Sequence, residues 1–416
     1  MMREVKSSGI AWIGTIPKCW ETDKLKYHLR RNEPRNPGDV VVLSLYRELG
    51  VIPKDSRDDN HNVTSEDTSK YKYVRPGDFV INKMKAWQGS VAVSEYEGIV
   101  SPAYFVYEFT DDAIFKRYFH YLLRSCYKDE FMRLSGGIRV GQWDLPADAL
   151  ENTPILIPPM DEQRRIADFL DAKCAEIDAL TADIQTQIDT LEQYKRSVIT
   201  ETVTKGLNPN VEMKDSGIEW VGQMPLAWDA VPNKYLMYKV KNVCPVYNGE
   251  DILSLTTNGV IIRDLNGGGK MPTSFDGYQK VTPGNLLMCL FDIDVTPRCI
   301  GLVKNFGLTS PAYSQFVMRT GVYAPYYYYY YLMVDYTKEL LHMAKNLRHS
   351  LTEDQLGAIK APNPPYEEQV QIAEFLDKKC VEISRVIEDK NKQLATLDEY
   401  KKSLIFEYVT GKKEVV

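Results

Sequence analysis

The sequence predicts an α+β fold in which two similar β-rich domains are separated by two long helices that form an antiparallel coiled coil. The main observation is a repeat: the segment DEQRRIADFLDAKCAEID, which starts at Asp161, returns as EEQVQIAEFLDKKCVEIS from Glu367. The segments before these two also share an opening motif, and short β-branched and aromatic runs follow each motif. A duplication of this length predicts a pseudo-two-fold internal repeat.

The repeat divides the 416 residues into four parts. A first β-rich domain is expected over 1–160, a first spacer helix over 161–207, a second domain over 208–366 and a second spacer helix over 367–416. A chain of this length exceeds one ordinary hydrophobic core, which agrees with several domains.

Each domain opens with the same motif. SSGIAWIGTIPKCW, which ends at Trp20, returns as DSGIEWVGQMPLAW, which ends at Trp228. Later anchors recur as well, for example SPAY at 101–104 and again at 310–313, while the sequence between the anchors diverges almost completely. One scaffold is therefore expected to carry two different surfaces.

Within the domains, runs such as VVLSLY, GDFVIN, AYFVYEF and SQFVMRT are typical of strands. Helices are expected over 112–124 and 326–334. Six consecutive tyrosines, Tyr326 to Tyr331, suggest a platform on which bases stack, but a helix turns half of them inward. Packing is therefore the favoured interpretation of this run.

The two spacer segments carry a heptad pattern typical of paired helices. The predicted seam comprises Leu170, Ile177, Ile184, Leu191 and Val198 in the first helix and Leu376, Ile383, Leu397 and Leu404 in the second, which has a polar Lys390 in the series. The intervening seam positions are assigned to Leu180, Tyr194, Val386 and Tyr400. About forty helical residues span roughly 60 Å. The helices bury their seams most simply against each other, with the domains at opposite ends; the alternative is that each helix packs on its own domain.

The charge distribution leaves a nucleic-acid partner open. The net charge is -6, but the acidic excess lies in the spacer segments, with 6 Lys+Arg against 10 Asp+Glu in 161–207 and 9 against 11 in 367–416. The two larger domains are balanced, so each has enough cations for a basic face. No run approaches the eighteen or so apolar residues of a membrane helix, and the N-terminus lacks the apolar core of a signal peptide. We therefore expect a cytoplasmic protein with no membrane partner.

The sequence assembles no catalytic site and no metal site. Residues 363–366 spell NPPY, which amino-methyltransferases use to hold the target base, but the equivalent residues 157–160 read IPPM, so a linker is favoured. GGGK at 267–270 departs from a phosphate-binding loop, and the five histidines show no ligand spacing. The seven cysteines form no CxxC pair. We expect no catalytic residue and no metal ligand in this chain.

Binding chemistry remains. Residues 82–89, NKMKAWQG, mix cations, amides and an aromatic ring in a turn between strands. Lysine neutralises phosphates, while arginine and glutamine address base edges in the major groove. Residues 135–142 and 345–349 hold cations at comparable places in the two copies. The candidate DNA-binding residues are Lys83, Lys85, Gln88, Arg139, Gln142, Arg263, Arg298, Gln315, Lys345 and Arg348.

With these motifs in view, the chain resembles the specificity (S) subunit of a type I restriction-modification system. The resemblance rests on the SGIxWxGxxPxxW openings, the helix starts after Pro158 and Pro364, and the QYKRSVI and EYKKSLI helix ends, each present twice. It covers essentially the whole chain.

The resemblance implies two target recognition domains, each of which reads one half of a split site in double-stranded DNA, joined by helices that set the spacer. It implies two modification subunits that use S-adenosylmethionine for DNA methylation, and two ATP-driven restriction subunits with their Mg. The S subunit itself binds no cofactor and is not catalytic. Deleting a heptad such as Ile177 to Asp183 should then change the spacer, and Arg139→Ala should impair one half-site only.

Two other classes of function remain open from the sequence. One is a helical adaptor whose domains bind protein, which salt-dependent binding to a DNA duplex would exclude. The other is a self-sufficient DNA-modifying enzyme, which would have to bind S-adenosylmethionine as an isolated chain.

Overall fold

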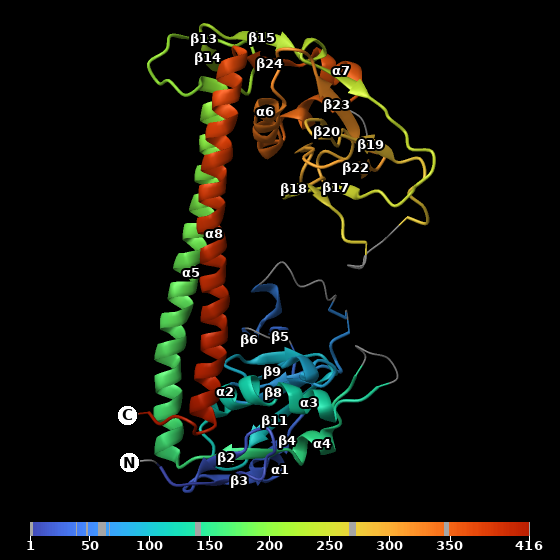
Figure 1. Cartoon of the computed structure of the whole chain (residues 1–416). Coiled ribbons are helices and arrows are strands. Elements are labelled where there is room, and N and C mark those ends of the chain that lie inside the picture. Colours follow the sequence, from blue (N-terminus) through green and yellow to red (C-terminus); the bar gives the residue numbers. More distant parts are fainter. Residues whose placement is uncertain are drawn as a thin grey trace. The chain divides into compact units, whose positions relative to one another are not determined.

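The computed structural model describes residues 3–38, 40–46, 49–56, 64–65, 67–137, 143–265, 272–344 and 349–415. The chain forms two compact units. The first unit comprises Met1–Ile184 and Lys392–Val416, and the second comprises Gln185–Asn391. The boundary therefore falls inside both long helices, α5 (Met160–Lys205) and α8 (Tyr366–Val409), which Figure 1 labels. Each unit contains one β-rich region and one half of each helix.

The first unit has twelve strands among its described residues, and its main sheet has the order β4-β11-β8-β9. Its elements are β1 (Val5–Ser7), β2 (Thr15–Pro17), β3 (Glu21–Lys24), α1 (Leu25–His28), β4 (Leu29–Arg31), β5 (Leu43–Tyr46), β6 (Gly50–Pro53), η1 (Lys54–Ser56), β7 (Lys72–Val74), β8 (Phe79–Asn82), η2 (Ala86–Gln88), β9 (Val91–Val93), β10 (Gly98–Val100), β11 (Tyr104–Phe109), α2 (Lys116–Cys126), α3 (Lys128–Leu134), α4 (Ala147–Glu151) and β12 (Pro154–Ile157).

The second unit repeats this order. Its elements are β13 (Met213–Asp215), β14 (Gln223–Pro225), β15 (Asp229–Pro232), η3 (Asn233–Tyr235), β16 (Met237–Val240), β17 (Ile252–Thr256), β18 (Gly259–Ile262), β19 (Gln279–Val281), β20 (Leu286–Met288), β21 (Ile300–Leu302), β22 (Gly307–Thr309), β23 (Ser314–Met318), α6 (Ala324–Thr337), η4 (Glu339–Met343), α7 (Glu353–Ala358) and β24 (Lys360–Asn363).

The two units share one topology. The sheet β4-β11-β8-β9 corresponds to β16-β23-β20-β21, and the pair β3-β12 corresponds to β15-β24. A second sheet, β18-β17-β22-β19, includes one parallel pairing of Ile252 with Leu308, and the first unit has the matching parallel bridge of Val42 with Ile99. The predicted mixture of strands and helices, and the predicted internal repeat, are both present in the fold.

The tyrosine run packs inside the second unit, as the sequence favoured. Five of the six tyrosines are buried, and only Tyr328 is partly exposed. The Tyr326 hydroxyl donates to the Val203 carbonyl of α5 at 2.9 Å, and the Tyr329 hydroxyl donates to Asp377 of α8 at 2.6 Å. Buried hydroxyls need such partners, so α6 fastens both long helices to the sheet.

In the first unit α2 makes the equivalent hydrogen bonds, but to the end of α8 and to the first half of α5. The Tyr118 hydroxyl of α2 donates to the Val409 carbonyl at the end of α8 at 2.9 Å. The Tyr121 hydroxyl donates to Asp171 of α5 at 2.6 Å. Each β-rich region therefore holds the start of the helix that follows it and the end of the other helix. In each unit the two helices contact each other and also the β-rich region, so the two alternatives do not exclude each other.

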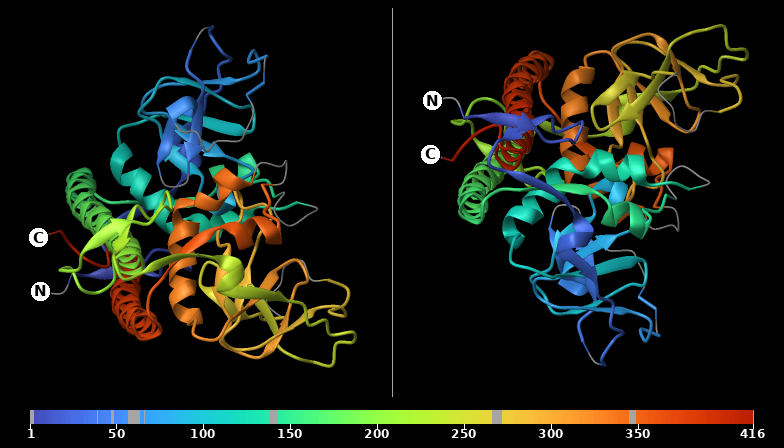
Figure 2. Two further views of the ribbon diagram at one scale, coloured as in Figure 1. Left: turned by 90° about the horizontal axis from the view of Figure 1, so that it is seen from above. Right: turned by 90° about the horizontal axis from the view of Figure 1, so that it is seen from below.

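In each unit the two helices run antiparallel. In the first unit Lys401 of α8 pairs with Asp178 of α5, and Tyr408 stacks on Phe169 with ring centroids 4.4 Å apart. In the second unit Lys195 donates to Ser384 at 2.8 Å, and Lys390 donates to Gln187. The two end-on views in Figure 2 show the helices side by side. Lys390 interrupts the apolar series but has a polar partner across the pair.

The intervening seam positions were predicted wrongly. Leu180, Tyr194, Val386 and Tyr400 are exposed by 47%, 48%, 45% and 53%. The positions four residues after the heptad residues are buried or half-buried instead, and Cys174 and Ile188 are examples of buried ones. The nine residues of the main predicted series are all buried or half-buried. Both helices therefore carry a second set of apolar side chains that their mutual contact leaves exposed.

Candidate nucleic-acid interface

In the first unit the fold brings together the two loops that the sequence singled out. The loop after β8 begins at Lys83, whose carbonyl accepts from the Leu145 amide at 3.0 Å. The Lys83 ammonium lies 2.9 Å from the Asp144 carboxylate, at the end of the loop that starts near Gly136. Trp87 and Trp143 meet edge to face with ring centroids 5.6 Å apart. The two loops thus form one surface.

The candidates on this surface differ in accessibility. Lys85 is exposed, while Lys83 and Gln88 are half-buried. Lys83 is held by its ion pair with Asp144. Arg139 and Gln142 lie outside the described residues, between Gly136 and Asp144 in the sequence.

Three cations surround Phe105 of β11 next to this surface. The Arg31 guanidinium lies 4.5 Å from the ring centroid, and the ammonium groups of Lys72 and Lys83 lie 5.5 and 5.9 Å from it. Glu33 pairs with Arg31 at 2.8 Å and with Lys72 at 2.9 Å. No sequence motif points to Arg31 and Lys72, because they come from other strands, β4 and β7, and reach Phe105 only in the folded chain.

Electrostatics shape this cluster. Burial and the neighbouring cations lower the pKa of Lys72, although its pairing with Glu33 opposes this shift. Burial alone would raise the pKa of Glu33, but the hydrogen bonds from Arg31 and Lys72 outweigh it and lower the pKa. Together with Lys83 and Asp144, the cluster contains three cations and two carboxylates. It therefore has one more positive than negative charge, which the negative charge of a DNA phosphate would balance.

The second unit places its corresponding loops together in the same way. The Leu351 amide donates to the Leu290 carbonyl at 2.8 Å, as Leu145 does to Lys83. The Ile293 amide donates to the His349 carbonyl at 3.3 Å. Lys345 and Arg348 precede His349 in the sequence and lie outside the described residues. The scaffold is shared, but acidic Asp292 and Asp294 now occupy the loop that carries lysines in the first unit.

Three other candidates lie apart from the loop tips. Gln315 of β23 is only 2% exposed. The Arg298 side chain is 15% exposed, lies over the Tyr336 ring at 5.1 Å and donates to the Thr257 carbonyl at 3.3 Å. In this conformation both side chains are largely buried inside the unit and are not available to contact DNA. Arg263, just after β18, is half-buried.

The NPPY residues connect β24 to α8, where the sequence favoured a linker. The Asn363 amide oxygen accepts from the Tyr327 hydroxyl at 2.9 Å and from Gln369 at 3.3 Å. In the described ranges no group of three or more His, Cys, Asp or Glu side chains is placed to hold a metal ion. None of the helices in these ranges combines the length and apolarity needed to cross a bilayer.

Comparison with known proteins gives consistent matches. Residues 27–190 match the family described as type I restriction modification DNA specificity domain. The type I restriction enzyme MjaVIII specificity subunit of Methanocaldococcus jannaschii is 25% identical over 96% of this chain and 94% of its own length. The putative type I restriction enzyme MjaX specificity subunit of the same organism is 24% identical over 97% of this chain and 96% of its own.

Solved structures share the fold. A chain from a type I R-M system, solved to explain complex assembly and conformational transition, aligns with a TM-score of 0.72 at 15% identity. The alignment covers 96% of this chain and 99% of that one. The HsdS subunit from Thermoanaerobacter tengcongensis aligns with a TM-score of 0.51 at 15% identity, over 96% of this chain and 98% of that one.

Proposed function

We propose that the chain is a specificity subunit of a type I restriction-modification system and that each of its two units reads one half of a bipartite DNA site. One observation carries the proposal: both units bring the same two loops together on the same scaffold, while the loop sequences differ. A shared scaffold presents its loops to DNA in the same way, and different loop residues read different bases.

In the first unit we assign phosphate contacts to Lys83 and Lys85 and base contacts to Gln88, Arg139 and Gln142. In the second unit we assign DNA contacts to Arg263, Lys345 and Arg348. The cluster around Phe105 adds Arg31 and Lys72 as positioning residues, since it keeps positive charge beside the loop of the first unit.

The helices supply a spacer and a docking surface. In the first unit, the exposed residues Leu180 of α5 and Tyr400 of α8 lie close in sequence to Asp178 and Lys401, which form an ion pair between the two helices. The repeat gives the second unit the matching pair Val386 and Tyr194. Two equivalent apolar patches fit two modification subunits, one on each unit.

The remaining parts of the system belong to the partners. We propose that the modification subunits hold S-adenosylmethionine, that two restriction subunits hold ATP and Mg, and that this chain is non-catalytic and binds no cofactor. Its place is then the cytoplasm, where the DNA and these partners meet.

DNA binding in complex with the modification partner tests the proposal. Because phosphate contacts release counterions, we expect log affinity to fall linearly with log salt. Lys85→Ala should lower the slope by about 1 for every duplex sequence. Asp148→Ala, on α4, is the matched surface control. The absence of salt-dependent duplex binding would instead support a protein-binding adaptor. S-adenosylmethionine binding by the isolated chain would support a self-sufficient enzyme.

A further inference from the structure

In the first unit, the carboxylate of Glu162 forms an ion pair with Arg3 of the same unit. The Arg3 guanidinium donates to both oxygens of Glu162, at 2.6 Å each, and contacts the Cys19 sulfur at 3.3 Å. The Trp20 indole also donates to Glu162 at 2.9 Å, and the guanidinium carbon lies 5.9 Å from the Trp20 ring centroid. The hydrogen bonds that Arg3 donates to Glu162 raise the pKa of Arg3. A carboxylate and an indole thus bind an arginine side chain together in the first unit.

The second unit repeats the site without the arginine. The register is fixed, because Val5 pairs with Pro17 across β1 and β2 as Met213 pairs with Pro225 across β13 and β14. Trp228 donates to Glu368 at 2.9 Å, as Trp20 does to Glu162. At the position of Arg3, however, the second unit has Val211.

A second cation is missing as well. In the first unit Lys18 pairs with Glu4 at 2.9 Å. The second unit keeps the carboxylate as Glu212 but has Leu226 in place of the lysine. Among the residues that the structure describes, neither Glu212 nor Glu368 has an ion pair. Both acids of the first site are thus retained, and both of its cations are replaced by apolar side chains.

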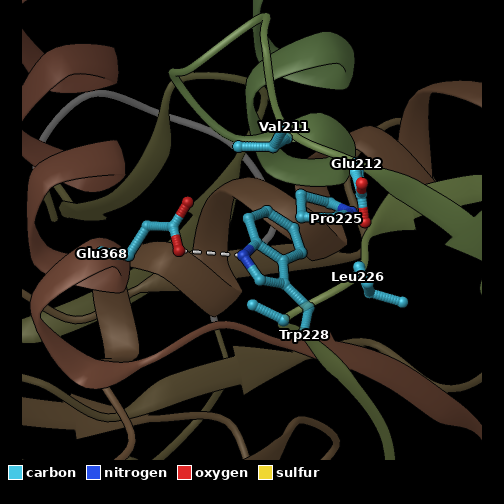
Figure 3. A pocket seen from close by; sticks show the side chains of 7 residues that line it. Val211, Glu212, Pro225, Leu226, Trp228 and Glu368 are labelled. Carbon is cyan, nitrogen blue, oxygen red and sulfur yellow. Dashed lines mark hydrogen bonds between the residues drawn. The ribbon is translucent and has the colours of Figure 1, made fainter.

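The result is an open pocket of about 420 Å³. It is lined by Val211, Glu212, Pro225, Leu226, Ala227, Trp228 and Glu368. Figure 3 shows the Glu368 carboxylate facing the Trp228 indole, with Val211 beside them. Gly206 has φ +75, and a Cβ at this position would lie 2.8 Å from the Glu368 oxygen that does not accept from Trp228. A larger residue at 206 would therefore crowd that oxygen.

We propose that this pocket binds an arginine side chain of a protein partner. The planar guanidinium matches a carboxylate bidentately and stacks on an indole, as Arg3 does in the first unit. Glu212 supplies a second negative charge. Leu226, which is 53% exposed, supplies an apolar rim of the kind found around arginine anchors in protein interfaces.

A protein-borne arginine fits this pocket better than the free amino acid. Free arginine carries its own carboxylate, which two nearby acidic side chains would repel. Because the first unit fills its site with Arg3, the chain offers this pocket on one unit only. A partner that docks on both units would gain the arginine contact at the second unit alone.

Indole NMR of the full-length chain tests the proposal, with the Trp228 signal assigned through Trp228→Phe. The probes are N-acetyl-arginine amide, its neutral isostere N-acetyl-citrulline amide, and free L-arginine. We expect the arginine amide to shift the Trp228 signal and to bind at least about tenfold more tightly than the citrulline amide, a difference of about 1.4 kcal/mol. Free arginine should bind more weakly than the capped form.

Two variants sharpen the result. Val211→Arg, which copies the first unit, should abolish the response to the arginine amide. Val211→Gln, similar in length but uncharged, should retain it. Arg3→Val should make the Trp20 signal respond, with Trp228 as the internal control. Equal binding of the citrulline amide, tighter binding of free arginine, or an unchanged response in Val211→Arg would overturn the proposal. None of these measurements depends on DNA binding.

Discussion

At the scale of single residues, buried tyrosine hydroxyls fasten the long helices to each β-rich region. Tyr326 is fully buried and donates to the Val203 carbonyl near the end of α5. Removing the hydroxyl leaves that buried carbonyl without its partner. We expect Tyr326→Phe to lower the free energy of unfolding by about 1–3 kcal/mol, measured by urea denaturation.

The neighbouring tyrosine provides the control for this change. Tyr328 is partly exposed, and within the described part of the chain its hydroxyl makes no hydrogen bond. Burial raises its pKa to about 12. Tyr328→Phe should change the free energy of unfolding by less than about 0.5 kcal/mol. Equal effects of the two substitutions would contradict a fastening role for the Tyr326 hydroxyl.

His120 of α2 should make the first unit sensitive to acid. Burial and the nearby Arg124 and Arg117 lower its pKa to about 3, and its ring accepts from the Val93 amide. Between pH 3 and the ordinary histidine value of about 6.5, the unfolded chain therefore binds more protons than the folded chain. Stability should fall as pH decreases through this window.

Melting temperatures at pH 7 and pH 5 check this expectation. His120→Gln keeps an acceptor for Val93 but does not titrate. The variant should lose less stability than the natural chain between these two pH values. Identical losses would show that His120 is not responsible.

Residue types alone predicted part of the candidate interface. The turn at Lys83–Gln88 and the loops at 135–142 and 345–349 could be recognised because they combine cations and amides with glycine or strand ends. The sequence did not show whether the side chains of Arg298 and Gln315 are buried or exposed, since the pattern of residues around them does not reveal which side chains pack inward. Arg31 and Lys72 join the Phe105 cluster only through the sheet pairing.

At the scale of elements, the helices illustrate an ambiguity in heptad patterns. Apolar residues occur three residues after some main seam positions, such as Leu180 and Tyr194, and four residues after others, such as Cys174 and Ile188, and only the second set is buried. The sequence alone does not show which of these two sets lies between the helices. The prediction selected the set that contains Leu180 and Tyr400, which the fold leaves exposed. The excess of apolar positions is itself the signal for a further partner.

We expect each exposed patch to hold one modification subunit. The double substitution Leu180→Glu and Tyr400→Glu places charges in the patch of the first unit. It should reduce the bound modification subunits from two to one, as counted by native mass spectrometry. Glu399→Gln, at an exposed position next to Tyr400, is the control and should leave two bound. Loss of both subunits, or of neither, would contradict two independent patches.

At the scale of the whole molecule, the duplication predicted two copies of one fold, and both copies have the same strand order. It did not predict that the end of α8 packs on the first β-rich region. There the Lys412 ammonium donates to the Ile13 carbonyl at 2.8 Å, close to the start of the chain. This contact joins the two ends of the chain, so no local pattern reveals it.

In both units, the end of one long helix contacts the opening motif. The end of α5 meets the opening motif of the second unit, where Gly206 lies against Trp228, and Gly411 after α8 lies against Trp20 of the first unit. Each unit is built from an opening motif, its own β-rich region and the ends of two helices. The spacer proposed above depends on those helices remaining intact between the units.

Mapping methylated adenines in a host that carries this chain and its modification partner tests the central claim most directly. The comparison is with a chain that lacks one heptad from each helix, residues 184–190 and 388–394, so that the antiparallel pairing is kept. Seven residues of helix correspond to about 10 Å, or about three base pairs of duplex. We expect a two-part motif whose half-sites stay unchanged while the gap between them shortens by about three base pairs. An undivided motif, or a gap that stays the same length in the shortened chain, would contradict the assignment of the two units as readers and the helices as their spacer.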